Sequence, residues 1–398
     1  MSAPPNGPPG RLLVVIPNWV GDVVLATPVL AALRTGFAES HITYLLRSYV
    51  TEVVTGGGWH DEVVCWPGGR GLGREKEIVR LARRLRAGRF DLALLLTNSL
   101  RSALVVRMGG VPRRVGYARD GRGWLLTDRL RPLKQGGRFV PRPVLPYYAA
   151  LAEHIGCPVP DRRLRLGITP EQEQAGRALL RHYELLVDGR QNGPAAAPAA
   201  GAHVARQSLA VRASATEDLE QGHARLRTRP YAAINVGAAF GAAKCWLPER
   251  FAEVCEQLHE RHGLLPVLVG AGHEAPLMRH IARQVHGPVV CCAEPGTTLG
   301  SLKIVIREAR LLVCNDTGPR HYGSAFNIPT VTIFGPTHQA WTDTDYAGEI
   351  KLQAQVPCGP CQLRACPLDL RCMQEVTTDM VMQAAAEVTS SKSRVISN

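Results

Sequence analysis

The sequence predicts an α/β protein made of two Rossmann-like, doubly wound domains that face each other across a cleft. Three observations lead to this prediction. Short, continuously apolar segments alternate with helical patterns, which is typical of parallel sheets covered by helices on both faces. The alternation forms two separate series, and 398 residues are enough for two cores of ordinary size. Charged residues make up 20% of the chain and hydrophobic residues 45%, which is a globular balance.

The first series of apolar segments predicts five strands in the N-terminal part of the chain. They are residues 11–16, 41–47, 61–66, 91–96 and 113–118. The series ends with a helix that is predicted to begin at Pro170 and to run to about Val187. Thr169 and Gln172 have the spacing of a capping box, and proline is favoured in the first turn of a helix.

The second series predicts five more strands. They are residues 231–236, 265–270, 288–293, 309–315 and 329–335, with a helix over 247–263. Between the two series lies a segment rich in Ala, Pro and Gly that has no core pattern, which is typical of a flexible insert. The predicted division of the chain is therefore a disordered tail (1–10), a first domain (11–187), the insert (188–227), a second domain (228–380) and a C-terminal helix or tail (381–398).

The charge of the chain favours an anionic partner. The formal net charge is +13 at pH 7, which suits phosphate groups, nucleic acid or an acidic membrane surface. A nucleic-acid partner is not expected, because the sequence has no recognised binding motif and no interleaved aromatic residues. No segment reaches the roughly 20 apolar residues of a membrane-spanning helix. The N-terminus lacks the apolar core of a secretory signal, so we expect a cytoplasmic protein that is soluble or peripheral on a membrane.

Residues 17–30 (PNWVGDVVLATPVL) place an aspartate where the first strand is followed by a helix. Asp22 could be the N-cap of that helix, since aspartate is a favoured cap worth about 1 kcal/mol over alanine. It could also be a general base at the mouth of the cleft. The two roles conflict in part, because amide hydrogen bonds lower the pKa of a carboxylate. The residues alone leave both interpretations open.

The loop after the first strand of the second series has the composition of an anion site. Residues 237–244 (GAAFGAAK) are mostly small and end in a lysine, shortly before a helix that begins near Pro248. Backbone N–H groups can approach an anion closely in such a loop. Lys244 could neutralise phosphate charge there, and the alternative is an ordinary solvated loop lysine.

A second loop of this kind follows the fourth strand of the second series. The strand ends in NDTG, and a helix begins near Pro319. The amides of Thr317 and Gly318 would face a phosphate at the start of this helix. Asp316 is expected to cap the helix or to orient a neighbouring polar group. His321 falls in the first helical turn, either toward the cleft or as a surface histidine.

These stretches together resemble glycosyltransferase family 9, the ADP-heptose:lipopolysaccharide heptosyltransferases, and within it most closely the heptosyltransferase II group. The similarity is spread over about 320 residues, and the motifs follow one another in the order of the family. The matching residues are 17–22 (PNWVGD), 98–104 (NSLRSAL), 237–251 (GAAFGAAKCWLPERF), 270–274 (GAGHE) and 315–337 (from NDTGPRHYGSAFNIP to FGPT).

The resemblance implies a GT-B fold and an inverting transfer of heptose from ADP-heptose to the inner core of lipopolysaccharide. The first domain would bind the acceptor and the second domain the nucleotide sugar. Asp22 and Lys244 match the catalytic pair of the family, as general base and as the lysine on the donor phosphates. The implied donor set is Lys244, Glu274 at the adenosine ribose, Asp316, Thr317, Gly318 and His321. The candidate acceptor-binding residues are Asn18, Asn98 and Arg101, with a plain surface charge as the alternative for Arg101.

The implied chemistry needs neither a second carboxylate nor a cofactor. Asp22 would take the proton of the acceptor hydroxyl, and ADP would leave without a protonating acid of the glycosidase kind. Lys244, the helix dipole and the amides near Thr317 would stabilise the charge on ADP. A divalent cation could stimulate the reaction. Asp343 and Asp345 form a D-x-D pair, which we interpret as part of a polar loop rather than as a metal–nucleotide signature.

Four of the eleven cysteines fall close together in residues 358–372 (CGPCQLRACPLDLRC). A disulfide set of this size would be unusual in an intracellular protein. The four thiols could bind zinc, form a redox-sensitive cluster or simply pack, and the residues leave these alternatives open. They are Cys358, Cys361, Cys366 and Cys372.

The basic helix predicted at 77–89 (EIVRLARRLRAGR) either covers the sheet as a solvated helix or contacts an anionic membrane. A lipid A-linked acceptor would lie at such a membrane. The expected partners are therefore ADP-heptose, a lipid A–core glycolipid and the inner face of the cytoplasmic membrane. Two alternatives stay open. One is a family 9 transferase for another nucleotide sugar and glycan acceptor, and the other is a non-catalytic nucleotide-sugar binding protein.

Overall fold

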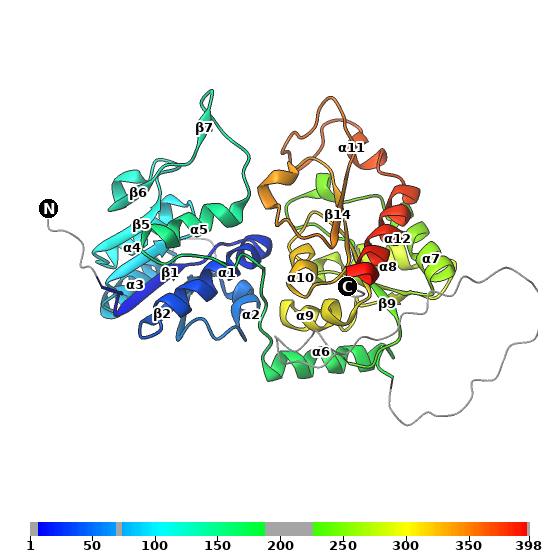
Figure 1. The fold of residues 1–398 in the computed structure, drawn as a ribbon, viewed down its shortest axis with the longest axis horizontal. Coiled ribbons are helices and arrows are strands. Elements are labelled where there is room, and N and C mark those ends of the chain that lie inside the picture. Colours follow the sequence, from blue (N-terminus) through cyan, green and yellow to red (C-terminus); the bar gives the residue numbers. More distant parts are fainter. Residues whose placement is uncertain (1–6, 69–73, 188–225, 396–398) are drawn as a thin grey trace, which may run out of the picture.

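The structure, a computed structural model, describes residues 7–68, 74–187 and 226–395. Parts of four predicted segments lie outside the described residues: 1–6 of the tail, 69–73 of the first domain, 188–225 of the insert and 396–398 of the C-terminal tail. The described residues form two lobes, each with one six-stranded parallel sheet and helices around it (Figure 1). This confirms the predicted α/β class with two doubly wound units.

The N-terminal sheet has the strand order β3-β2-β1-β4-β5-β6, and all its strands are parallel. In this Rossmann order the chain changes direction between β1 and β4, which leaves a ligand crevice at the carboxyl ends of those strands. The strands are β1 (Arg11–Val15), β2 (His41–Leu46), β3 (Glu62–Cys65), β4 (Leu92–Leu95), β5 (Arg113–Tyr117) and β6 (Asp128–Leu130). A small antiparallel hairpin follows, made of β7 (Lys134–Gln135) and β8 (Arg138–Phe139).

Helices cover both faces of this sheet because its strands are apolar on both faces. Alternate residues of β1 pack into two different cores, one with α1, α2 and α5 and one with α3 and α4. The helices are α1 (Val20–Gly36), α2 (Thr51–Val54), α3 (Arg74–Ala87), α4 (Leu100–Met108) and α5 (Val144–His154). The short turns η1 (Ser48–Val50) and η2 (Gly123–Leu125) precede α2 and β6.

The C-terminal sheet repeats the same topology, with the order β11-β10-β9-β12-β13-β14 and parallel pairing throughout. Its strands are β9 (Tyr231–Asn235), β10 (Leu265–Val269), β11 (Val290–Cys291), β12 (Leu311–Asn315), β13 (Thr330–Phe334) and β14 (Glu349–Gln353). Its helices are α7 (Pro248–His262), α8 (Ala275–Ala282), α9 (Leu299–Glu308), α10 (Arg320–Ala325), α11 (Arg371–Gln374) and α12 (Thr378–Val395). The short turns are η4 (Ala242–Lys244), η5 (Gly272–Glu274) and η6 (Gln339–Thr342).

All ten predicted strands are present, but each sheet has a sixth strand that was not predicted. These strands, β6 and β14, lie at sheet edges and read DRL and EIKLQ, so they lack the continuous apolar run of a buried strand. β11 is shorter than the predicted 288–293, because the chain turns between Ala293 and Gly296.

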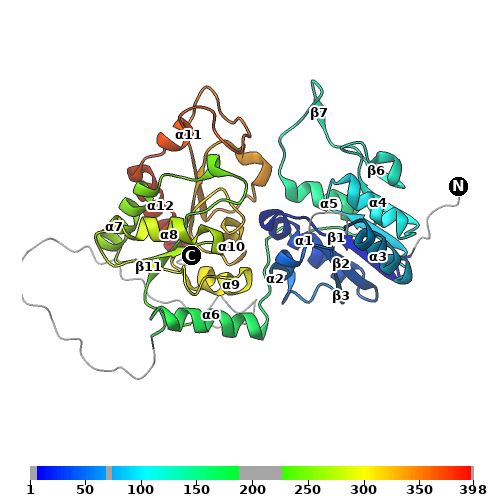
Figure 2. The same ribbon diagram turned by 180° about the vertical axis from the view of Figure 1, so that it is seen from behind.

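α6 (Pro170–His182) begins as predicted, with the complete capping box of Thr169 and Gln172. The predicted end at Val187 is wrong. Glu184 has a φ of 54°, a left-handed conformation that a right-handed helix cannot continue through. The predicted division assigns α6 to the first domain, but α6 packs against α9 of the C-terminal lobe, as two opposite views show (Figures 1 and 2).

A buried lysine joins the two lobes beside α6. Lys303 of α9 is fully buried. Its ammonium group donates to the carbonyl oxygens of Thr55 and Gly167 at 3.1 and 2.7 Å, and to Oε1 of Gln172 at 3.2 Å. These acceptors belong to the end of α2, the segment before α6 and α6 itself. The lysine therefore attaches α9 of the C-terminal lobe to α2 of the N-terminal lobe. It also attaches α9 to α6 and to the segment before α6, which connect the two lobes in the sequence.

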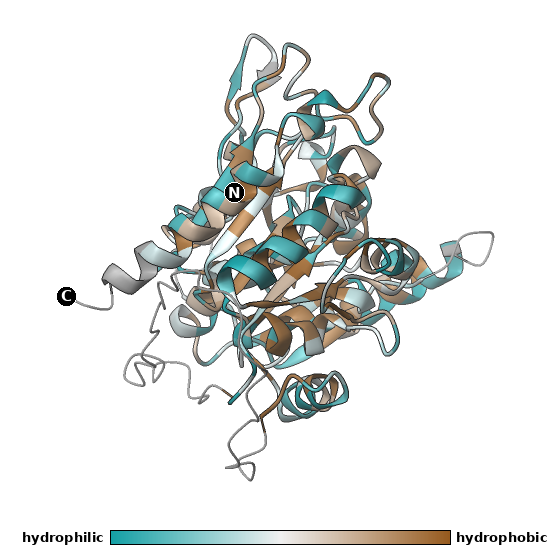
Figure 3. Cartoon of the chain, turned by 90° about the vertical axis from the view of Figure 1, so that its right-hand side faces the viewer, coloured by the Kyte–Doolittle hydropathy of each residue, from teal (hydrophilic) through white to brown (hydrophobic). Residues whose placement is uncertain are grey.

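Hydropathy follows this architecture. Hydrophobic strands lie inside each lobe, and several helices turn hydrophilic faces outward (Figure 3). Among the described residues, no helix is both long enough and apolar enough to span a bilayer.

Candidate active site

The two lobes meet closely where α1 faces α10, and both contact points are glycines. A Cβ atom added to Gly21 would lie 3.1 Å from Cδ2 of His321, and one added to Gly318 would lie 2.7 Å from Cβ of Val20. The lack of a side chain at each glycine therefore permits this approach. It brings the loop after β1 next to the loop after β12, both at the carboxyl ends of their strands, where ligands of such sheets bind.

Asp22 lies at this contact, but it does not cap α1. The helix begins at Val20 with Trp19 as its N-cap residue, and no side chain forms a cap hydrogen bond. Asp22 is therefore in the first turn of the helix, and the interpretation of Asp22 as an N-cap is wrong. Within the described part of the chain, the half-buried carboxylate of Asp22 has no ion-pair partner within 4.0 Å.

Burial and neighbouring charges make Asp22 a better base than an ordinary aspartate. Burial raises its pKa, Lys244 acts against burial and Asp316 adds to it, and the resulting pKa is about 6. A carboxylate with this pKa is mostly ionised at neutral pH, and it holds a proton more strongly than an exposed aspartate does.

Asp316, at the end of β12, is held by three donors. Lys244 Nζ donates to its Oδ2 at 2.5 Å and to its main-chain oxygen at 3.1 Å. Thr337 Oγ1 donates to Oδ2 at 2.7 Å, and Arg320 Nη1 donates to Oδ1 at 3.2 Å. Burial alone would raise the pKa of Asp316, but Lys244, Arg320 and these hydrogen bonds outweigh burial and lower it. Asp316 thus orients polar neighbours, as one interpretation predicted, and does not cap α10, whose N-cap residue is Pro319.

A second layer of charge holds Arg320. Its guanidinium group is fully buried and donates to both carboxylate oxygens of Glu349, at 2.8 and 3.1 Å. Its Nη1 also donates to Thr342 Oγ1 at 2.7 Å. Each nitrogen of the guanidinium group thus has an acceptor, and Arg320, after Lys244, helps to lower the pKa of Asp316.

Lys244 is not a solvated loop lysine. Its side chain is only 12% exposed, and its ammonium group also lies 5.0 Å from the centre of the Phe240 ring. Asn315 holds this loop in place, since its Nδ2 donates to Val236 O at 2.9 Å and its Oδ1 accepts from Trp246 N at 3.1 Å. Asn315 thus hydrogen-bonds the end of β12 to both ends of the loop that carries Lys244.

Glu274 lies over the loop that follows β9. Its Oε2 accepts from the backbone N–H of Ala271 at 2.7 Å. A Cβ atom added to Gly237 would lie 1.7 Å from its Oε1, so glycine allows the carboxylate to keep this position. The carboxylate is thus placed at the carboxyl ends of β9 and β10, on the same edge of the sheet as Lys244.

His321 is buried in the contact between the lobes and is not a surface histidine. Burial, reinforced by Arg320, holds the pKa of His321 well below its usual range, so the imidazole is neutral at neutral pH. Thr317 and Gly318 are half-buried between β12 and α10. A contribution of their amides to phosphate binding stays a prediction.

The candidate acceptor residues lie in the N-terminal lobe, outside this cluster. Asn98 Oδ1 accepts from the Tyr147 hydroxyl at 3.0 Å and from Arg122 Nη2 at 3.4 Å. Arg101 and Asn18 are exposed. The structure thus brings Asp22, Lys244, Asp316 and His321 together, and it leaves the acceptor residues as a prediction.

Comparison with known proteins identifies the family. A sequence profile of glycosyltransferase family 9 (heptosyltransferase) matches residues 78–371. The chain belongs to glycosyltransferase family 9. It is 27% identical to lipopolysaccharide heptosyltransferase 2 of Escherichia coli over 337 residues, which cover 83% of this chain and 84% of that protein. It is 25% identical to lipooligosaccharide heptosyltransferase 2 of Haemophilus ducreyi over 337 residues, with coverage of 83% and 85%.

Solved structures of the family share the fold. The TM-score is 0.72 to a family 9 glycosyltransferase of Veillonella parvula, at 20% identity and with 96% and 97% of the two chains covered. It is 0.68 to the ADP-heptose lipopolysaccharide heptosyltransferase II of E. coli, at 20% identity and with 96% and 99% covered. The fold is thus of the GT-B type, and the chain is a glycosyltransferase, as the resemblance predicted.

The cysteine cluster of this glycosyltransferase lies in the segment that precedes and begins α11. In the ranges that the structure describes, no three His, Cys, Asp or Glu side chains are arranged to hold a metal ion, so the zinc interpretation gains no support. The segment contacts the loop after β9, since Arg364 O accepts from Ala243 N at 3.1 Å. Cys358 and Cys361 are exposed, Cys366 is half-buried and Cys372 is buried.

The D-x-D pair of the glycosyltransferase is part of a turn. Asp343 forms an ion pair with Lys351, and its Oδ1 accepts from Asp345 N at 3.2 Å. Asp345 has a φ of 53°. These contacts fit the interpretation of the pair as a polar loop.

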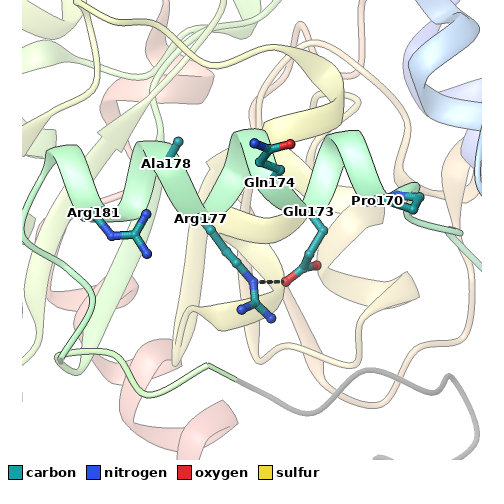
Figure 4. Close-up of a pocket in the computed structure, with 6 residues that line it drawn as sticks. All are labelled: Pro170, Glu173, Gln174, Arg177, Ala178 and Arg181. Atoms are coloured by element: carbon teal, nitrogen blue, oxygen red, sulfur yellow. Dashed lines mark hydrogen bonds and ion pairs between the residues drawn. The ribbon is translucent and has the colours of Figure 1, made fainter. Parts of the chain in front are cut away.

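The outer face of α6 forms an open pocket whose charged residues stabilise the fold. Glu173 accepts from Arg177 Nε at 2.8 Å, and its two oxygens also accept from Arg307 of α9 at 2.8 and 3.1 Å. These bonds attach α6 to the C-terminal lobe. The lining residues are Pro170, Glu173, Gln174, Arg177, Ala178 and Arg181 (Figure 4).

Sequence analysis missed three residues of the site: Arg320, Thr337 and Glu349. The first two lie inside the quoted motif at 315–337, so the motif itself was a signal that side chains beyond NDTG take part. Glu349 had no such signal, because it begins the edge strand β14 that the sequence pattern did not predict.

Proposed function

We propose that this glycosyltransferase is an inverting heptosyltransferase that transfers heptose from ADP-heptose to the inner core of lipopolysaccharide, with Asp22 as general base. One observation supports this most: two aspartates meet at the contact of the lobes, and their pKa values are shifted in opposite directions. A free base beside a fixed cationic site is what displacement of a diphosphate requires. The names of the relatives in E. coli and H. ducreyi add support for the sugar and the glycan.

The proposed reaction forms one bond and breaks one. The oxygen of an acceptor hydroxyl attacks the anomeric carbon of heptose, and the bond from that carbon to the diphosphate oxygen breaks with its electron pair going to ADP. Asp22 accepts the proton of the attacking hydroxyl. Attack from the side opposite to ADP inverts the anomeric centre, and no covalent enzyme intermediate forms.

Lys244 is the residue that we propose to stabilise the leaving group. An ammonium group has three N–H donors, and two of them are used on Asp316. The third is available to a phosphate oxygen, and a charge-assisted bond of this kind strengthens as ADP gains charge. Thr317, Gly318 and His321 would complete the phosphate site. Glu274 would meet the adenosine ribose with the oxygen that lies over Gly237.

The proposal includes the surroundings of the reaction. The acceptor would be a lipid A–core glycolipid at the inner face of the cytoplasmic membrane, contacted through Asn18, Asn98 and Arg101. No cofactor is required in this scheme, although a divalent cation could stimulate the reaction by binding the diphosphate.

The test compares wild-type protein with Asp22→Asn on ADP-heptose and heptosylated lipid A core. ADP release and the mass of the acceptor report transfer, and ADP binding with thermal unfolding reports an intact donor lobe. Asp345→Asn is the matched control, because it makes the same chemical change at an exposed turn with φ of 53°, which asparagine tolerates. We expect transfer by wild type and by Asp345→Asn, and loss of transfer in a folded Asp22→Asn that still binds ADP.

Three other outcomes would change the proposal. A wild type that binds ADP but transfers no heptose would indicate another nucleotide sugar or another glycan acceptor. An active Asp22→Asn would remove Asp22 from the mechanism. Loss of activity in Asp345→Asn would reopen the metal–nucleotide interpretation of the D-x-D pair.

A further inference from the structure

We infer that the outer side of the N-terminal lobe docks on an anionic lipid bilayer through an apolar ridge on α4. The ridge is defined as Leu100, Leu104 and Met108 of α4 together with Trp124 of η2. The inference rests on the proposed function for its purpose, which is to bring the enzyme to an acceptor carried by a membrane lipid. The surface itself follows from exposure, spacing and charge.

The ridge is a continuous row of exposed apolar side chains. Leu100, Leu104 and Met108 are 47%, 41% and 40% exposed, and a spacing of four residues places them on one face of the helix. Trp124 is 64% exposed, and η2 packs against α4. Leu133, which precedes the β7–β8 hairpin, is exposed in the same lobe. Contiguous apolar surface of this kind marks an interaction site.

Packing of α4 on its own sheet does not account for the ridge. The opposite face of the helix carries Ala103, Val105 and Val106, which are fully buried in the core with α3 and the sheet. A helix that covers a sheet ordinarily has a polar outer face. α4 instead has apolar residues on both faces, so its outer face is suited to contact a second apolar environment.

The segment of the chain that carries the ridge is strongly basic. Residues 92–152 contain eleven Lys and Arg but only two Asp and Glu, in a chain whose net charge is +13. Both acids are already matched by arginines: Asp128 pairs with Arg113 at 2.9 Å, and Asp120 lies 3.6 Å from Arg119. The surplus is therefore not neutralised by the acids of this segment.

Part of this surplus lies on the ridge itself. Arg101 and Arg107 are exposed on α4 between the apolar residues. Arg86 of α3 reaches the other end of the helix, where its Nε lies 3.5 Å from the Cβ position of Gly110. A row of apolar side chains with arginines between and beside them fits lipid chains below anionic headgroups.

Charge also argues against two other occupants. A second copy of this chain would bring the same arginines face to face in a symmetric contact, which repulsion disfavours. A nucleic acid would pair with the arginines but would place the apolar side chains against a polar backbone. An anionic bilayer offers headgroups to the arginines and lipid chains to the apolar side chains.

The position of the ridge suits access to the cleft. α4 starts two residues after Asn98, at the carboxyl end of β4, so the ridge begins at the rim where the acceptor is expected. α3 and α4 lie on the side of the N-terminal lobe that faces away from the C-terminal lobe, in both opposite views (Figures 1 and 2). Docking through this side leaves the donor lobe free of the membrane.

The experiment is flotation of the full-length protein with lipid vesicles. Vesicles rich in phosphatidylglycerol are compared with pure phosphatidylcholine, at low and at high salt. The ridge variant is Leu104→Ser/Met108→Ser/Trp124→Ser, which spares the residues of the proposed active site. The matched control is Leu363→Ser/Leu368→Ser, since these residues are also exposed, at 45% and 62%, but belong to the C-terminal lobe.

We expect wild type and the control to float with anionic vesicles, less at high salt, and not with neutral ones. The ridge variant should lose at least about tenfold in vesicle partitioning, because three apolar side chains no longer enter the lipid. It should keep wild-type turnover of a delipidated, soluble acceptor and a wild-type unfolding temperature.

Equal flotation of the ridge variant and wild type would overturn the inference, and so would equal binding of wild type to neutral vesicles. A variant that floats normally but changes the oligomeric state or the affinity for nucleic acid would assign the ridge to that other partner. The proposed function fails separately: a wild type that floats through the ridge yet transfers no heptose leaves the docking surface in place and refutes only the reaction.

Discussion

Asp22 and Asp316 face the same contact between the two lobes, but their surroundings are opposite. Asp22, in the first turn of α1, has no ion-pair partner among the described residues, and its pKa is raised to about 6. Asp316, after β12, is bonded to Lys244, Arg320 and Thr337, and its pKa is lowered. Burial pushes both pKa values upward, and the hydrogen-bonded cations around Asp316 reverse that effect there.

The comparison shows how the two lobes divide the work. A carboxylate that is locked in a salt bridge keeps one charge state and can hold a cationic site in shape for an anion. A carboxylate without partners can gain and lose a proton at a pH near neutrality. In the proposed mechanism the C-terminal lobe contributes binding, and the N-terminal lobe contributes the group whose protonation changes during the reaction.

The largest expected effect separates the two aspartates by activity. Asp22→Asn should lower kcat by about 10²- to 10⁴-fold, the usual contribution of a general base. Its dissociation constant for ADP should stay within about twofold of the wild-type value, because Asp22 has no hydrogen bond to the loops after β9 and β12. Steady-state kinetics and calorimetric titration with ADP measure the two quantities. A large loss of ADP affinity in this variant would contradict the assignment of binding to the C-terminal lobe and of the base to the N-terminal lobe.

The second effect concerns folding stability, and it should have opposite signs at the two positions. Asp316→Asn leaves the buried charges of Lys244 and Arg320 poorly matched, so we expect a loss of about 3 kcal/mol in the free energy of unfolding. Asp22→Asn removes a half-buried charge that has no ion-pair partner among the described residues, so its stability should equal or exceed that of wild type. Urea unfolding at neutral pH measures both. A destabilised Asp22→Asn would mean that the carboxylate has a partner after all.

A third buried charge tests whether hydrogen bonds can replace an ion pair. Lys303 donates to three oxygens, none of them a carboxylate, and burial lowers its pKa to about 7 with Glu52 opposing the shift. Lys303→Met should cost about 1 to 3 kcal/mol, because three buried acceptors lose their donor. Lys351→Met is the control, since Lys351 is a half-buried lysine with an ordinary partner in Asp343. An equal loss of unfolding free energy in both variants would show that the contacts of Lys303 between the lobes stabilise the protein no more than an ordinary ion pair does.

The sequence predicts the fold well because the fold depends on local patterns. All ten predicted strands are present, most of them as apolar runs, and the start of α6 is a capping box with proline in its first turn. The loops after β1, β9 and β12 were also found from sequence, since each joins a strand to a helix through small or polar residues. Their gathering at one edge then follows from the Rossmann topology.

The electrostatics of the site could not be predicted, because they depend on packing across the two lobes. In the sequence, Asp22 has the position of a helix cap. In the structure it lies in the first turn of α1, where α1 contacts α10, and it is not the N-cap residue. Arg320 and Glu349 are 29 residues apart and meet because β14 pairs with β13 at the edge of the sheet. The apolar ridge is also invisible in sequence, since Leu104 and Val105 look alike until the sheet covers only one of them.

The smallest effect is the pH dependence, and it gives the most direct test of the comparison. Asp22 accepts a proton only when it is ionised, so kcat/KM should fall about tenfold for each pH unit below its pKa of about 6 and level off above it. Lys244 opposes burial at Asp22, so replacing Lys244 by methionine should move this acidic limb to higher pH, on top of a general loss of rate. The Asp345→Asn control should leave the limb in place. An acidic limb that stays at the same pH without Lys244 would mean that the titrating base is a different group, and the contrast between Asp22 and Asp316 would then describe the structure but not the mechanism.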